Sequence, residues 1–279
     1  MPIHDQGYRR FEGSRGRLGT AWLVIARAAV RSMLRRRRFA ALLLLAWAPF
    51  LVRAIQVYAT ANWPQLSAFA PTASTFREFL DQQGMFVFFV TVYAGAGLIA
   101  NDRRANALQI YLSKPLTRLE YVAGKAAVLM AFLLFVTWVP ALLLLVVQIA
   151  LAGSLEFARR NLFLLPAITL FSFLQVALAT LTMLALSSLS KSSRFVGVMY
   201  AGIILFTGAI QGMLWFITRA PAVSLISPTT SLNQIGDVIF RTPPRYDIPW
   251  IWSLVAVLAI LALSVLVLER RVRGVEVVA

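Results

Sequence analysis

The residues of this chain that could support chemistry gather in one stretch, 97–125, GLIANDRRANALQIYLSKPLTRLEYVAGK. This stretch separates two long apolar runs that carry almost no charge. Acidic, basic and apolar side chains mixed at this spacing suit binding to a protein or a lipid headgroup surface. The charged members are Asp102, Arg103, Arg104, Lys114, Arg118, Glu120 and Lys125.

Apolar residues recur at helical spacing within this charged stretch. Leu108, Tyr111 and Leu112 stand at positions i, i+3 and i+4, which predicts a short amphipathic helix over 106–113. Such a helix would lie across the membrane face and could bury its apolar side in a protein groove. A solvated basic loop that follows the positive-inside rule fits the same residues, and the pattern alone leaves both readings open.

The second half of the stretch carries a helix stop and a helix start. Pro115 ends the first helix, because the residue before a proline is disfavoured in the helical region. Thr117 and Glu120 have the spacing of a capping box, which predicts that the next helix begins at Arg118.

The rest of the chain offers little catalytic chemistry. It has no cysteine and one histidine, His4, so thiolate sites and histidine metal clusters are excluded. It contains no Walker-type phosphate-binding loop, and no pair of acidic residues falls inside an apolar run. Arg53 is the one candidate for a buried ionisable group, near the edge of a run. We therefore expect no enzyme activity in this chain, and any energy it uses should come from a partner.

Composition indicates a membrane protein. Apolar residues make up 59% of the 279 residues, charged residues only 14%, and the mean hydropathy is +0.76. The net charge of +16 is carried by residues that flank apolar runs. Anionic lipids are therefore the expected acidic partner, and nucleic acid is not.

The N-terminal part predicts a tail and then a helix at the membrane surface. Residues 1–18 are polar and basic and read as a flexible tail. Over 19–38, apolar residues follow one helical face, while Arg27, Arg31 and Arg35 follow another, which predicts an interfacial amphipathic helix. A plain run of stop-transfer charges is the alternative.

Six apolar runs then predict an all-α integral membrane protein with six transmembrane helices in a domain over 39–268, followed by a tail over 269–279. Residues 63–83 are expected to form an outer loop, and 232–240 a short helix in the last outer loop. The predicted spans are 39–58, 84–100, 126–152, 162–189, 195–217 and 250–268. With these boundaries, twenty of the 27 Lys and Arg residues fall on one side. Both termini are therefore expected in the cytoplasm.

The layout and the charged stretch together resemble the type-2 permease family of ATP-binding-cassette exporters. The chain departs from the family pattern at Asp102, where glutamate is usual, and at Asn106-Ala107, where Gly-Thr is usual. A Ser227-Pro228 step in the last outer loop also resembles the family. The residues that carry the resemblance are Ile99-Ala100, Asp102-Arg103, Ala107-Leu108, Leu112, Pro115, Arg118 and Gly124-Lys125.

The resemblance implies a bacterial inner-membrane permease that pairs with a second permease copy, or a homologous one, and docks P-loop ATPase subunits. ATP and Mg²⁺ would bind on the ATPase, so no cofactor is expected in this chain. The apolar spans weakly favour a lipidic substrate. A structural membrane subunit and an ATP-independent channel or carrier are the alternatives. The implied ATPase-coupling residues are Asp102, Arg103, Arg104, Leu108, Tyr111, Leu112, Pro115 and Arg118. Polar residues in spans are candidates for a translocation path: Gln148, Gln175, Thr182 and Gln211.

Overall fold

The computed structural model describes residues 21–107, 117–151, 157, 159 and 161–272. Within these residues the chain forms helices and turns and no strand. Six of the helical stretches are long and apolar enough to cross a membrane. This part of the chain is therefore an all-α fold of the multi-pass membrane type, as the composition predicts.

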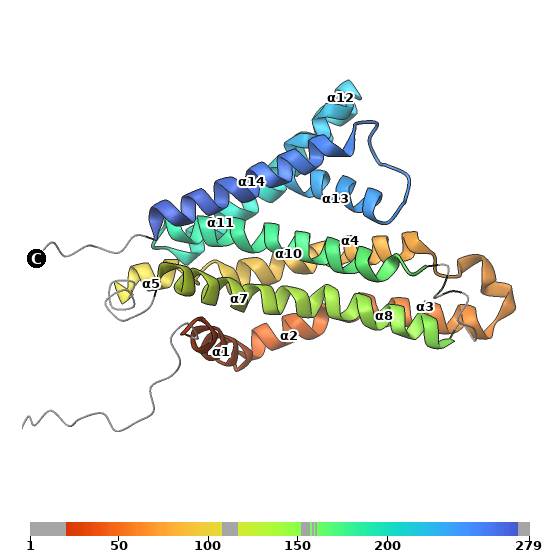
Figure 1. Ribbon diagram of the computed structural model, residues 1–279, viewed down its shortest axis with the longest axis horizontal. Coiled ribbons are helices and arrows are strands. Elements are labelled where there is room, and N and C mark those ends of the chain that lie inside the picture. Colours follow the sequence, from red (N-terminus) through yellow and green to blue (C-terminus); the bar gives the residue numbers. More distant parts are fainter. Residues whose placement is uncertain (1–20, 108–116, 152–156, 158, 160, 273–279) are drawn as a thin grey trace, which may run out of the picture.

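Each predicted span corresponds to one of these six helical stretches, which lie side by side in Figure 1. Several consist of two helices joined at a break. The stretches are Arg37–Asn62 (α2 and α3), Ala73–Arg104 (α4 and α5), Arg118–Leu151 (α7 and α8), Leu164–Leu189 (α10), Ser193–Thr218 (α11 and α12) and Trp250–Arg271 (α14).

The predicted outer loop over 63–83 is wrong in its second half. A 3-10 helix, η1 (Pro64–Phe69), is followed by α4 (Ala73–Val90), which begins well before the predicted start of the second span. Phe76, Phe79 and Leu80 are fully buried on one face of α4. Polar residues are interspersed with these positions and follow them, and two of the polar residues, Arg77 and Gln83, are themselves buried, so a hydropathy reading misses this part of the helix.

Prolines account for two of the breaks. α2 (Arg37–Leu45) gives way to α3 (Ala48–Asn62) just before Pro49, and α7 (Arg118–Val136) gives way to α8 (Trp138–Leu151) just before Pro140. A proline inside a helix lacks the N–H donor and clashes with the carbonyl four residues earlier. Both breaks fall where this clash would occur.

Two other long stretches contain a π-helical turn. One is η2 (Thr91–Gly95), between α4 and α5 (Ala100–Arg104), and the other is η3 (Gly202–Phe206), between α11 (Ser193–Ala201) and α12 (Thr207–Thr218). π turns of this kind bend a helix and are frequent at functional sites.

The helix α1 (Ala21–Leu34) crosses the bundle rather than joining it. It packs against α7, and Figure 1 shows it nearly end-on while the long helices run across the view. The sequence predicts one helix over 19–38, but Arg37 and Arg38 belong to α2 instead, after a break at Arg36. The prediction of a separate helix before the first span is confirmed.

The last third of the chain leans away from the other helices in Figure 1. After α12 the chain forms η4 (Pro221–Ile226) and then α13 (Pro228–Ile239), which packs against α14, α10 and α4. The short helix predicted over 232–240 is therefore present, and it begins four residues earlier.

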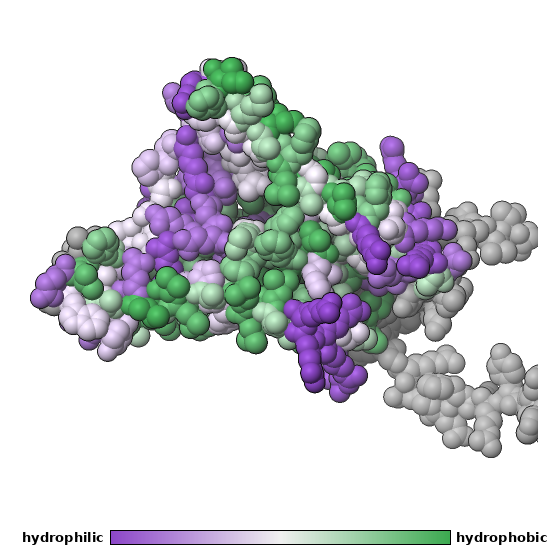
Figure 2. Space-filling view, turned by 180° about the vertical axis from the view of Figure 1, so that it is seen from behind, coloured by the Kyte–Doolittle hydropathy of each residue, from purple (hydrophilic) through white to green (hydrophobic). Residues whose placement is uncertain are grey.

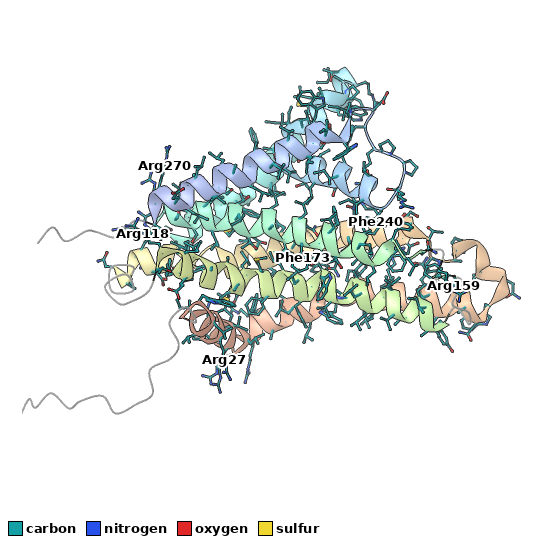
Figure 3. The ribbon with its side chains drawn as sticks, in the orientation of Figure 1. Arg27, Arg118, Arg159, Phe173, Phe240 and Arg270 are labelled. Carbon is teal, nitrogen blue, oxygen red and sulfur yellow. The ribbon has the colours of Figure 1, made fainter. Side chains whose placement is uncertain are left out.

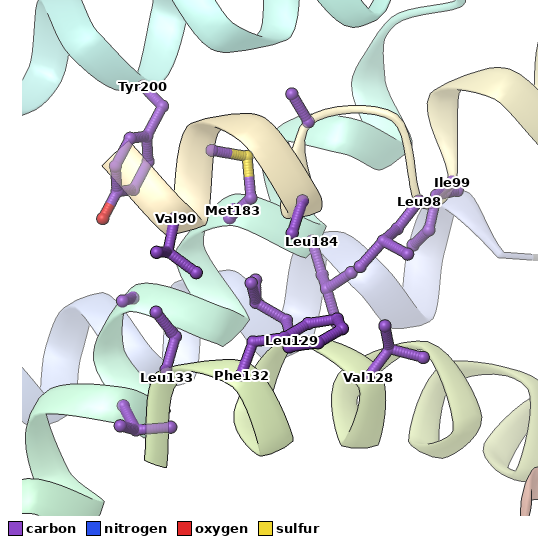
Figure 4. Close-up of a cluster of buried hydrophobic side chains, with 14 of the residues drawn as sticks. Val90, Leu98, Ile99, Val128, Leu129, Phe132, Leu133, Met183, Leu184 and Tyr200 are labelled. Carbon is purple, nitrogen blue, oxygen red and sulfur yellow. The ribbon is translucent and has the colours of Figure 1, made fainter. Parts of the chain in front are cut away.

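The core is divided into two clusters of buried apolar residues along the bundle. One lies towards α5 and joins α4, α7, α10 and α11, as Figure 4 shows around Leu129, Phe132 and Met183. The other lies towards the opposite end and is built around Phe76, Phe171 and Phe240. Figure 2 shows apolar side chains across the middle of the molecule and polar side chains gathered towards both ends.

Candidate functional site

The charged stretch of the sequence lies at one end of the bundle, where α4, α7 and α10 meet. We call this region the α5 junction and define it by Asp102, Arg103, Tyr121, Lys125 and Ser187. Arg27, Arg118 and Arg270 lie at the same end of the molecule, and Arg159 lies at the opposite end (Figure 3). The junction is therefore at the more basic end of the described structure.

Ser187 of α10 forms hydrogen bonds with the backbone at a break in the second span. The helix unwinds into a turn between η2 and α5, so backbone groups there lose their helical partners. The Ser187 hydroxyl accepts from the N–H of Ile99 (3.1 Å) and of Ala100 (3.0 Å), and it donates to the carbonyl of Ala96 (2.9 Å). One fully buried side chain thus satisfies three backbone groups and fixes α5 to α10.

Asp102 fixes the same helix to α7. Its carboxylate is 2.7 Å from the ammonium of Lys125, and it accepts a hydrogen bond of 2.7 Å from the Tyr121 hydroxyl. The Lys125 ammonium also lies 5.5 Å from the centre of the Tyr121 ring. Because Lys125 and Tyr121 are buried, this is a largely desolvated ion pair with a second donor, which makes the geometry specific.

The other described coupling candidates divide into two kinds. Arg103 is half-buried and donates to the carbonyl of Ser188, so it adds a second link between α5 and α10. Arg104 and Arg118 are exposed at the two edges of the loop. The structure thus places Asp102 and Arg103 within the junction and leaves Arg104 and Arg118 at its surface.

Four of the coupling candidates, Leu108, Tyr111, Leu112 and Pro115, lie outside the described residues, as does most of the short helix predicted over 106–113. The capping box that follows is confirmed. Thr117 accepts from the N–H of Glu120, the Glu120 carboxylate accepts from the N–H of Thr117, and α7 begins at Arg118.

The helix α1 packs directly against α7, which carries Tyr121 and Lys125 of the junction. A Cβ added at Gly124 would lie 3.0 Å from the carbonyl oxygen of Trp22 and 3.1 Å from Cβ of Ile25, so a larger residue here would have to displace α1 slightly. The opposite face of α1 is basic and exposed, and forms the compact hydrophilic cluster below the bundle in Figure 2. Arg27 and Arg31 lie on this face, and Arg35, the third arginine that the sequence indicates, is exposed just after the end of α1.

The structure does not bring together the four residues that the sequence predicts for a translocation path. Gln175 and Thr182 of α10 line a cavity of about 390 Å³ among α4, α10, α11, α13 and α14. Gln211 of α12 is buried elsewhere and donates to the Tyr246 hydroxyl at 3.0 Å. Gln148, on α8, is half-buried and is not among the cavity residues.

The structure contains a second polar cluster, at the end opposite the junction, that the sequence did not predict. Arg77 of α4 is 2% exposed, donates to Asp237 of α13 at 3.0 Å, and also pairs with Asp81. Arg245 pairs with both carboxylates, so two arginines and two aspartates alternate. We call these four residues the far-end ion cluster.

The far-end ion cluster ties the second span to α13. Arg77 also donates to the carbonyl of Asn233 at 2.8 Å, and its guanidinium lies 4.7 Å from the centre of the Phe171 ring. Gly236 faces both side chains, since an added Cβ would lie 2.5 Å from Cε2 of Phe171 and 2.7 Å from Nε of Arg77. Burial raises the pKa of Asp237 above its ordinary value, and attraction to the two arginines offsets only part of this effect.

Arg53, the ionisable candidate in the first span, also has a partner at this end of the bundle. It donates to Glu78 of α4 at 3.1 Å and to Gln56 at 3.1 Å. Its charge is therefore compensated within the chain, which reduces the cost of placing it near the edge of a span.

No group of three or more His, Cys, Asp and Glu residues within the described part of the chain could hold a metal ion. No protein-family model matches the chain, and no curated protein matches it either.

Proposed function

We propose that the chain is the membrane-spanning permease subunit of an ATP-binding-cassette transporter, an exporter, that acts as a dimer in a bacterial inner membrane. A separate P-loop ATPase, which binds ATP and Mg²⁺, docks on the loop 101–125, and both termini lie in the cytoplasm. The observation that carries the proposal is the α5 junction, where buried polar contacts fix the start of this loop to two other spans.

The junction suits the transmission of force. A load on the loop 101–125 reaches α4 through the chain, α10 through Ser187 and Arg103, and α7 through Asp102. A loop that only joins two spans needs no buried ion pair, and such a pair is costly unless its geometry is specific. The contacts therefore favour a mechanical role over a passive connection.

The surroundings of the loop suit docking between a membrane and a protein. Arg104 and Arg118 are exposed beside the loop and are available to an acidic partner surface. The exposed arginines of α1 lie on the face that points away from α7, where anionic lipid headgroups would hold this helix in the interface. α1 would then support α7 from the side while the ATPase acts on the loop.

Co-purification tests the proposal. The chain is extracted from its native membrane in a mild detergent and captured, and the proteins that accompany it are identified by mass spectrometry. We expect a P-loop ATPase in roughly equal amount. Recovery of the intact chain without any ATPase, while a known transporter from the same membrane keeps its own, would contradict the proposal. A structural subunit or an ATP-independent carrier would then be the better assignment.

A further inference from the structure

The cavity beside α10 extends along this helix and is partly open to the surface of the bundle. Its wall follows α10 from Gln175 to Leu189, about 21 Å at the helical rise of about 1.5 Å per residue. This is about two thirds of the hydrocarbon thickness of a bilayer, roughly 30 Å. Leu263 of α14, which also lines it, is 62% exposed. A lipid chain could therefore enter sideways from the membrane.

The volume of the cavity fits one hydrocarbon chain. At about 30 Å³ for each water-sized group, its volume of about 390 Å³ holds on the order of a dozen such groups. The wall is mainly apolar, and no Asp, Glu, Lys, Arg or His is among the residues that form it. A charged headgroup would enter this space without a counter-charge, which is costly in a low-dielectric site.

Two residues of the cavity wall nevertheless carry buried polar atoms that lack partners among the described residues. The side chain of Gln175 is 7% exposed, and its carbonyl oxygen has no donor among the described residues. The hydroxyl of Thr182, two turns further along the same face of α10, is also without a partner there. Native structures rarely leave such buried groups unsatisfied, so each one requires an explanation. Both atoms are occluded from a water-sized group in the cavity, so a ligand that brings a hydrogen-bond donor would provide this explanation by turning the side chain towards itself.

The turn at the start of α13 adds a further polar element to the wall. Thr229 lines the cavity at the second residue of this helix, and the first intrahelical bond of α13 is donated by Ser231 to Ser227. The Thr229 N–H therefore precedes the hydrogen-bonded part of the helix. The N-cap residue Ser227 is 1% exposed, and its hydroxyl has no partner among the described residues.

We propose that this cavity binds an uncharged single-chain amphiphile, with its hydrocarbon chain along α10 and its hydroxyl group donating to the carbonyl oxygen of Gln175, whose side chain turns into the cavity on binding. The inference goes beyond the permease role, because binding needs neither ATP nor an ATPase. Failure of one proposal would therefore leave the other standing.

Photo-crosslinking tests the proposal on the purified full-length chain in detergent. The probe is a long-chain alcohol with a diazirine on the chain and an alkyne for detection. We expect adducts in the peptides of α10 and α14 that face the cavity. Unlabelled alcohol should compete at about tenfold lower concentration than the carboxylate of equal chain length at alkaline pH, because the carboxylate must lose its hydration.

Variants separate the cavity from the outer surface of the bundle. Ala179→Phe fills the cavity and should abolish specific labelling, whereas Leu170→Phe, on the exposed face of α10, should leave it unchanged. Ala185→Phe serves as a second filling variant if the first does not fold. Gln175→Leu should weaken competition by the alcohol about fivefold, the value of one modest hydrogen bond. Equal competition by alcohol, carboxylate and alkane would overturn the proposal, and so would undiminished labelling in a folded filling variant.

Discussion

Ser187 provides the sharpest test of how the α5 junction is held together. The change Ser187→Ala removes one hydroxyl group and leaves the Ile99 N–H, the Ala100 N–H and the Ala96 carbonyl without that partner. The site is fully buried, so water does not readily replace the lost bonds. The helix break beside α5 should therefore loosen.

The size of the effect follows from the number of bonds. Hydrogen bonds between membrane helices contribute about 0.6 kcal/mol each on average, and hydrogen bonds in proteins generally up to about 1.5 kcal/mol. Three bonds to one hydroxyl then predict a loss of about 2 to 4.5 kcal/mol in the free energy of unfolding. The neighbouring residue supplies a matched control, because the hydroxyl of Ser188 donates only to Ala185 within its own helix. Ser188→Ala should cost less than about 1 kcal/mol.

Two measurements on the purified protein report the result. Denaturant titration in mixed micelles gives the free energy of unfolding, and hydrogen exchange of the segment around 96–104 reports local opening. Ser187→Ala should lower both the stability and the protection of this segment, while Ser188→Ala should leave protection near that of the wild type. Equal effects of the two changes, or full protection of Ile99 and Ala100 in Ser187→Ala, would refute the assigned role of this hydroxyl.

Three further changes probe the junction, the far end and the topology. Asp102→Asn should lower the free energy of unfolding by about 2 to 4 kcal/mol, because it leaves the buried Lys125 unpaired. Adding Lys125→Met should recover part of this loss in a double-mutant cycle, whereas independent, additive losses would contradict the pairing. Gly236→Ala should destabilise the protein by about 1 to 3 kcal/mol through overpacking. The control Gly208→Ala, which has open space around it, should change the stability by less than about 0.5 kcal/mol. A neutral Gly236→Ala would exclude the close packing. Ser74 and Lys191 are both exposed in this cysteine-free chain, so a cysteine at either position can react if the reagent reaches its side of the membrane. With an impermeant thiol reagent in intact cells, Ser74→Cys should react and Lys191→Cys should not. The reverse pattern would mean that the orientation is inverted.

Local signals in the sequence were enough to predict most of the helices. Long apolar runs identify all six membrane-length stretches, because a span needs about 20 apolar residues wherever it lies in the fold. The capping box of Thr117 and Glu120 locates the start of α7, since all of its bonds are made within one turn. The basic and apolar faces of α1 are equally local. These features depend on neighbours in the sequence and are therefore readable without a structure.

Features made by distant residues could not be predicted in the same way. Arg77 and Asp237 are separated by 160 positions, and nothing near either residue indicates the other. The i, i+4 spacing of Arg77 and Asp81 is a weak local signal that this segment is helical, and a reading by hydropathy passes over it. Likewise, Ser187 looks like one of many small polar residues in a span, and only the unwound turn opposite it reveals its role.

Site-specific photo-crosslinking in the native membrane tests most directly whether an ATPase docks beside α5, as we propose. A photoreactive amino acid replaces Arg104, which is exposed at the edge of the loop, or Asp247, which is exposed in the connection between α13 and α14. We predict that the Arg104 position captures a P-loop ATPase and that the Asp247 position captures none. Capture of no ATPase at Arg104 by a correctly inserted chain, or equal capture at both positions, would contradict the account.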